Sequence, residues 1–85
     1  MSSIREKITV KEKTKVFVGG LNPITSEISL SQYFSKYGRV IESVIMRYSN
    51  GISRCFGFVT FDDPSVIDSI VRTVHILDNK QVLVS

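Results

Sequence analysis

The stretch RCFGFVTF, from Arg54 to Phe61, decides the fold because it forms a strand with two different apolar sides. Successive side chains of a strand point to opposite faces of its sheet. One side of this strand carries two small residues and two core-forming ones, Cys55, Gly57, Val59 and Phe61. The other side carries a cation, two aromatic rings and a hydroxyl, namely Arg54, Phe56, Phe58 and Thr60. Burying an unpaired charge is costly, so Arg54 predicts that its own side faces solvent and that the other side faces the core.

Two further strands are predicted next to this one. The segment KVFVGG (residues 15–20) is short, rich in β-branched and aromatic residues, and closed by glycines, which is typical of a strand. With Val16 and Val18 in the core, Lys15, Phe17 and Gly19 lie on the solvent-facing side. A strand at about 40–47 is followed by Asn50-Gly51, a dipeptide that favours a tight turn, so RCFGFVTF should return antiparallel to it.

Two helices are predicted from apolar residues spaced i, i+3, i+4 and i+7. The first has Thr25 as its cap, Glu27 in its first turn and Gly38 at its end, and its apolar stripe is Leu30, Tyr33, Phe34 and Tyr37. The second has Asp63 as its cap and Pro64 at its first position, and its stripe is Ile67, Ile70, Val71 and Val74.

A turn at residues 78–80 and a last strand at 81–85 complete the order βαββαβ. Each helix has one apolar stripe, so both must pack on one face of a four-stranded antiparallel sheet. The other face is left open to solvent. The predicted fold class is α+β.

Composition limits the functions that are available to the chain. Eighty-five residues suffice for one small domain, and no apolar run approaches the roughly 20 residues of a membrane-spanning helix. Cys55 is the only cysteine and His75 the only histidine, so we expect neither a disulfide framework nor a metal or catalytic site, and no cofactor. We expect a reducing compartment, the nucleus or the cytoplasm.

The net charge of +3 is concentrated at the start of the chain. Residues 1–15 carry five basic and two acidic residues, whereas residues 16–85 carry six of each. We therefore expect a flexible basic segment at 1–14 and a folded domain at 15–85 that is close to neutral. This distribution permits a nucleic-acid partner but does not require one, because a charged tail can serve solubility alone.

Two segments carry a family resemblance. VFVGGL (residues 16–21) and RCFGFVTF resemble the two ribonucleoprotein signatures of the RNA recognition motif. The second follows the pattern K/R-G-F/Y-G/A-F-V-x-F/Y except at Cys55, where the family has glycine. KVFVGGL, VIMR, FGFVTF and HILDNKQV are similar to the Musashi, DAZ-like and heterogeneous nuclear ribonucleoprotein group. The resemblance covers residues 15–85 and implies a ferredoxin-like βαββαβ sandwich.

The resemblance also implies a function and a site. Phe17 and Phe56 would each stack a base, Phe58 would pack against a sugar or between nucleotides, and Arg54 would pair with a phosphate. Further contacts would come from Lys15, Met46, Arg47, Leu83 and Ser85. The expected ligand is single-stranded RNA, with single-stranded DNA as a further candidate in vitro, and the expected role is mRNA processing or post-transcriptional regulation. We expect a monomer that also has candidate protein partners.

Three alternatives stay open at this point. A protein-interaction module could use the same fold to hold a peptide, and the neutral body and the absence of Lys and Arg from residues 48–53 favour it. An enzyme could share the topology, since fold does not fix function, although no acid–base or nucleophile pair is visible. Finally, the three phenylalanines could lie in a core, but this would need a third layer for which the chain has no apolar segment.

Overall fold

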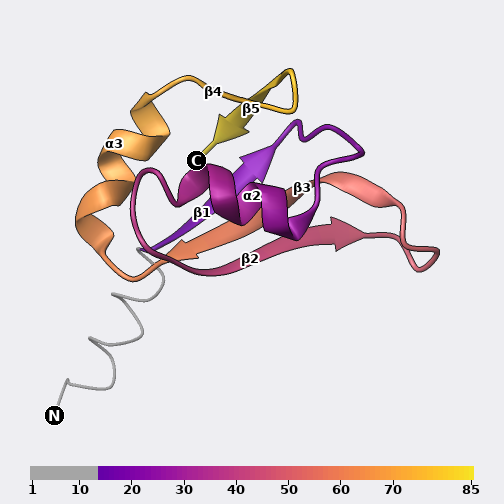
Figure 1. Ribbon diagram of the computed structural model, residues 1–85, viewed down its shortest axis with the longest axis horizontal. Coiled ribbons are helices and arrows are strands. Elements are labelled where there is room, and N and C mark those ends of the chain that lie inside the picture. Colours follow the sequence, from indigo (N-terminus) through magenta and orange to yellow (C-terminus); the bar gives the residue numbers. More distant parts are fainter. Residues whose placement is uncertain (1–13) are drawn as a thin grey trace, which may run out of the picture.

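The computed structural model describes residues 14–85. In chain order the elements are β1 (Lys15–Gly19), α2 (Glu27–Phe34), β2 (Val40–Arg47), β3 (Ser53–Phe61), the 3₁₀ turn η1 (Pro64–Val66), α3 (Ile67–Arg72), β4 (His75–Leu77) and β5 (Lys80–Val84) (Figure 1). The predicted flexible segment at 1–14 lies outside the described residues except for Thr14. This residue is buried, and its carbonyl accepts a hydrogen bond from the Phe61 N–H at 2.8 Å. The folded domain therefore includes Thr14.

The sheet is antiparallel, with the strand order β2-β3-β1-β5-β4. The topology confirms the α+β prediction, but the expected count of four strands was wrong, because residues 14–85 form five. The additional strand is β4, whose three residues pair with β5 across a turn at Asp78 and Asn79. Both turn residues have positive φ, 53° and 64°. A three-residue strand is too short to produce a recognisable alternation in the sequence.

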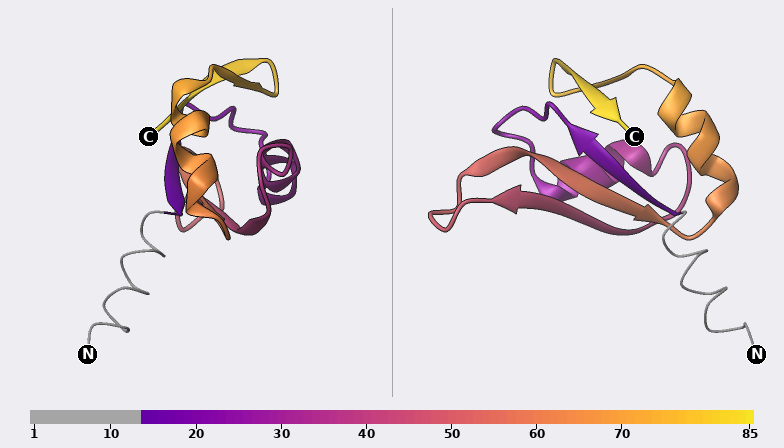
Figure 2. Two further views of the ribbon diagram at one scale, coloured as in Figure 1. Left: turned by 90° about the vertical axis from the view of Figure 1, so that its left-hand side faces the viewer. Right: turned by 180° about the vertical axis from the view of Figure 1, so that it is seen from behind.

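The core lies on one side of the sheet, between the strands and the helices. Val16 and Val18 of β1 and Val59 and Phe61 of β3 are buried there, as predicted. They pack with Leu30 and Phe34 of α2 and with Ile70 of α3. Seen from behind, the strands lie in front of α2, and no helix crosses the face of the sheet that is turned to the viewer (Figure 2, right). The two helices thus leave one face of the sheet uncovered, as the sequence predicted.

The first helix begins and ends differently from the prediction. Its N-cap is Ser26, which forms a capping box with Ser29, and Thr25 is not the cap. Thr25 is instead buried, and its hydroxyl donates to Asp78 Oδ2 at 2.6 Å, which ties the β1–α2 loop to the β4–β5 turn. The helix ends at Phe34, four residues before Gly38. Gly38 packs closely against η1, because a Cβ there would lie 3.2 Å from Val66 Cγ1.

The second helical segment starts where it was expected. The carboxylate of Asp63 accepts from the Ser65 N–H at 2.9 Å, and Pro64 opens the 3₁₀ turn that continues into α3. The predicted apolar stripe was wrong at its end, because Val71 inside the helix and Val74 beyond its last residue, Arg72, are both exposed. No helix among residues 14–85 has the length and apolarity that crossing a membrane requires.

His75 is part of the core, whereas Val71 and Val74 of the predicted stripe are not. Its ring is fully buried and bonds to the Ile70 carbonyl through Nε2 and to the Tyr33 hydroxyl through Nδ1, both at 2.8 Å. A carbonyl only accepts hydrogen bonds, so Nε2 carries the proton and Nδ1 accepts from Tyr33. The ring therefore ties β4 to both helices, through Tyr33 of α2 and Ile70 of α3.

Candidate nucleic-acid interface

Three aromatic rings form a cluster on the uncovered face of the sheet. The ring centroid of Phe17 on β1 lies 5.7 Å from that of Phe56 and 5.8 Å from that of Phe58, both on β3. Phe17 is 37% exposed, and the other two rings are half-buried. None of the three belongs to the core cluster on the opposite face. The rings are thus accessible, and they are close enough to support one another in a fixed arrangement.

The backbone of the central strands determines where these rings lie. Phe17 is paired with Phe58 across β1 and β3, and the next pair on the same face is Gly19 with Phe56. Gly19 leaves room for the Phe17 ring, because a Cβ at this position would lie 2.8 Å from Phe17 Cε2. On the other side of β3, a Cβ on Gly57 would overlap the carbonyl oxygen of Val44. Small residues on both faces therefore let the strands and rings pack this closely.

Two cations flank the aromatic cluster. The ammonium of Lys15 lies 5.6 Å from the ring centroid of Phe58. The guanidinium of Arg54 lies 5.0 Å from the ring centroid of Phe56, at the other end of the cluster. Both side chains are exposed, and both distances are within the range of a cation–π contact. The uncovered face thus offers planar rings with a positive charge at each end, an arrangement that suits stacked bases and their phosphates.

The outer strands bring three more predicted residues to the same face. Val44 of β2 is paired with Phe58, so Met46, two residues further along, shares its side of the strand. Leu83 of β5 is paired with Gly19 and is 68% exposed. Ser85 exchanges two backbone hydrogen bonds with Phe17, at 2.8 and 3.0 Å, and its side chain is exposed. These residues border the cluster on both sides.

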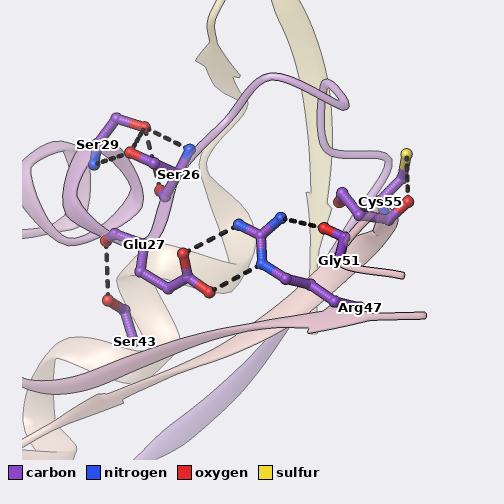
Figure 3. Close-up of polar contacts among 8 residues, drawn as sticks. Ser26, Glu27, Ser29, Ser43, Arg47, Gly51 and Cys55 are labelled. Atoms are coloured by element: carbon purple, nitrogen blue, oxygen red, sulfur yellow. Dashed lines mark hydrogen bonds and ion pairs between the residues drawn. The ribbon is translucent and has the colours of Figure 1, made fainter. Parts of the chain in front are cut away.

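Arg47 lies on the opposite face, although the sequence grouped it with Met46. Its guanidinium donates to both carboxylate oxygens of Glu27 on α2, at 3.0 and 3.3 Å, and to the Gly51 carbonyl at 3.1 Å (Figure 3). The hydrogen bond from Arg47 lowers the pKa of the Glu27 carboxyl below its ordinary value. In this arrangement Arg47 fastens the β2–β3 turn to α2, and its predicted contact with RNA stays a prediction.

Cys55 lies at a β-bulge and not in the core. Ile45 is paired with Gly57, and the next pair is Arg47 with Ser53. One residue of β2 and three residues of β3 lie between these pairs, so β3 bulges here. Cys55 has φ 64°, in the left-handed region, is half-buried, and donates its N–H to Ser53 Oγ at 2.9 Å. Its predicted place among the core residues was therefore wrong, because strict alternation fails at a bulge.

Further residues of the uncovered face were absent from the predicted set, among them Glu42, Val44, Tyr48, Ile76 and Gln81. Alternation from Met46 would have indicated Val44. Ile76 is paired with Gln81 on β4 and β5, and both are exposed, so the unpredicted fifth strand widens the face. Tyr48 lies in the turn after β2, where no periodicity signals its position.

Among residues 14–85, no group of three or more His, Cys, Asp or Glu side chains could hold a metal ion.

The sequence is similar to known proteins over most of its length. The family model of the RNA recognition motif matches residues 16–82. Nuclear polyadenylated RNA-binding protein 4 of Saccharomyces cerevisiae is 49% identical over 73 residues, which are 85% of this chain and 14% of that protein. Heterogeneous nuclear ribonucleoprotein 1 of Arabidopsis thaliana is 40% identical over 72 residues, which are 84% of this chain and 18% of that protein. This chain thus spans less than a fifth of either relative.

Solved structures show the same similarity in three dimensions. The RNA-binding domain of Hrp1, solved in complex with RNA, has a TM-score of 0.82 and 47% sequence identity, over 88% of this chain and 46% of that one. The corresponding domain of mouse Deleted in azoospermia-like has a TM-score of 0.72 and 29% identity, over 85% of this chain and 89% of that one.

Proposed function

The chain belongs to the RNA recognition motif family, and we propose that its uncovered sheet face binds short single-stranded RNA. The proposal rests on the cluster of Phe17, Phe56 and Phe58. The ring centroids of Phe56 and Phe58 lie 5.7 and 5.8 Å from that of Phe17, and the rings are open to solvent. Unpaired bases expose both their faces and their edges, so exposed rings can stack on them. The Hrp1 domain, whose structure contains RNA, supports the choice of ligand.

The proposed contacts divide by chemistry. Phe17 and Phe56 each stack one base, and Phe58 packs against a sugar or between neighbouring nucleotides. Lys15 and Arg54 lie at opposite ends of the aromatic cluster and contact phosphates. Residues at the border of the face, which include Met46, Leu83 and Ser85, contact base edges. Stacking contributes about 1–3 kcal/mol per base, so a face with two or three rings binds with modest affinity.

For the protein that carries this domain, we propose a role in mRNA processing or post-transcriptional regulation. The relatives support this role through their names, which describe nuclear polyadenylated RNA-binding and heterogeneous nuclear ribonucleoproteins. We propose that it works in the nucleus, the cytoplasm or both, and that it binds RNA without catalysing a reaction. In this scheme residues 14–85 are the RNA-binding domain, and the basic residues before Thr14 add non-specific attraction to RNA.

The double variant Phe56→Ala, Phe58→Ala tests the proposal. It removes two rings that lie outside the core, so it should stay folded and lose RNA affinity about ten-fold or more. Ile28→Ala is a matched control, because this exposed apolar residue lies on α2, on the covered side of the sheet. Fluorescence polarisation with labelled RNA pools of randomised sequence measures the affinity. Unchanged binding by the double variant would overturn the proposal.

Salt dependence separates RNA binding from the alternative of a peptide-binding module. Phosphate contacts release condensed counterions, so RNA affinity should fall as salt rises. Among the described residues Lys15 and Arg54 flank the cluster, and a protein that lacks residues 1–13 should therefore show a shallower slope than the full chain. An apolar peptide held by the same rings would bind almost independently of salt.

A further inference from the structure

We infer that Tyr48 provides one more stacking position for a base, at the β2–β3 turn and continuous with the aromatic cluster. The inference rests on the proposed function, since it extends the same RNA-binding face by one nucleotide. Tyr48 is 59% exposed and lies directly after β2. This turn projects beyond the rest of the sheet at one end of the molecule (Figure 1).

Arg54 connects Tyr48 to the cluster. Its guanidinium carbon lies 5.6 Å from the ring centroid of Tyr48 and 5.0 Å from that of Phe56. A planar guanidinium stacks on aromatic rings as well as pairing with phosphate. Because one guanidinium contacts both rings, Tyr48 lies beside the Phe56 end of the cluster. The row of flat surfaces therefore runs from Phe58 through Phe17 and Phe56 to Arg54 and Tyr48.

The turn holds Tyr48 in place by its backbone. The Tyr48 N–H donates to the Ile52 carbonyl and the Gly51 N–H donates to the Tyr48 carbonyl, both at 2.9 Å. Arg47 then joins the Gly51 carbonyl to the carboxylate of Glu27 on α2 (Figure 3). A ring carried on a fastened turn loses little conformational freedom when a base stacks on it, so it contributes more of its stacking energy to affinity.

The composition of the turn favours stacking over phosphate binding. Residues 48–53 contain no Lys or Arg, so the turn has no cation of its own to offer a phosphate. Tyr48 is its one aromatic side chain, and stacking tolerates any base because every base has a π-face. A tyrosine that only shielded Arg54 would not respond to the length of the bound RNA, and this difference makes the inference testable.

The test measures affinity against RNA length for wild type, Tyr48→Ala, Tyr48→Phe and Ile52→Ala. The probes are labelled RNA pools of randomised sequence and fixed length, from three to eight nucleotides, studied by fluorescence polarisation. Tyr48→Ala should bind the shortest pools as the wild type does and lose about five-fold or more once the RNA is long enough to reach the turn. Tyr48→Phe keeps the ring and should retain the affinity. Ile52→Ala, at a residue of similar exposure in the same turn, should bind normally at all lengths.

Each other outcome overturns the inference. Wild-type affinity of Tyr48→Ala at every length shows that no base stacks there, and equal weakening at every length shows that Tyr48 acts only through Arg54. Equal losses in Tyr48→Ala and Ile52→Ala show that the turn was distorted. The Phe56→Ala, Phe58→Ala variant, measured in parallel, separates the two proposals. If that variant loses affinity and Tyr48→Ala does not, the RNA-binding face stands and only its extension fails.

Discussion

Cys55→Gly removes a side chain from a backbone position that disfavours one. Cys55 has φ 64° at the bulge in β3, and a left-handed conformation costs a residue with a Cβ roughly 1–2 kcal/mol. Glycine avoids this cost, but its greater freedom in the unfolded chain offsets about 0.5–1 kcal/mol. The sulfur adds little, because its one hydrogen bond, to the Ser53 carbonyl, is 4.0 Å long. The glycine variant should therefore be about 0.5–1 kcal/mol more stable than the wild type.

Cys55→Ala is the control that separates the strain from the thiol. Alanine keeps the Cβ and loses the sulfur, so its stability should equal or fall slightly below that of the wild type. Urea unfolding followed by circular dichroism under reducing conditions gives the midpoint for all three proteins. Thermal unfolding should show an increase of roughly 2–8 °C for the glycine variant. A glycine variant no more stable than the alanine variant would refute the argument from the bulge.

Three further predictions concern the strands and the aromatic residues. Gly57→Ala should destabilise the fold by about 3 kcal/mol or more in urea unfolding, because its Cβ would overlap the Val44 carbonyl, which the backbone fixes in place. Gly19→Ala should shift the free energy of unfolding by less than about 1 kcal/mol. It should weaken RNA binding measurably in fluorescence polarisation, because the new Cβ would lie 2.8 Å from Phe17 Cε2 and displace that ring. Binding equal to that of the wild type would contradict the proposed role of the ring. Burial raises the pKa of Tyr33 to about 12. The stability that this shift contributes should be complete below pH 10 and be lost as the pH rises towards 12, and absorbance titration at 295 nm (compared with Tyr33→Phe) should show one tyrosine that ionises late.

The sequence was sufficient to predict which face of the central strands carries the aromatic rings, although Thr60, expected on that solvent-facing side of β3, is buried. The charge of Arg54 and the alternation along β1 and β3 place Phe17, Phe56 and Phe58 on the solvent side, and the structure confirms that placement. Alternation works here because it depends only on the pleat of a regular strand. The antiparallel pairing of β2 and β3 was also predictable from local sequence, because Asn50-Gly51 favours a tight turn between two strands.

The errors lie where tertiary contacts override local patterns. Cys55 occupies a bulge, and which strand carries extra residues depends on the pairing partner as well as on its own sequence. Thr25 and Ser26 are both good caps, and Thr25 loses this role because its hydroxyl is bound to Asp78, far along the chain. Arg47 faces Glu27 on α2, because its position continues the covered side of β2. The family resemblance implied an RNA contact for Arg47, and that contact stays a prediction.

Chemical-shift mapping by NMR, during titration with short RNA pools of randomised sequence, tests the central claim most directly. RNA should perturb the ring and amide signals of Phe17, Phe56 and Phe58, while signals of Ile28 and Ser29 on α2 stay unchanged. This result would place the ligand on the uncovered face of the sheet. Perturbations that gather on α2 and α3 and spare the three rings would contradict the account.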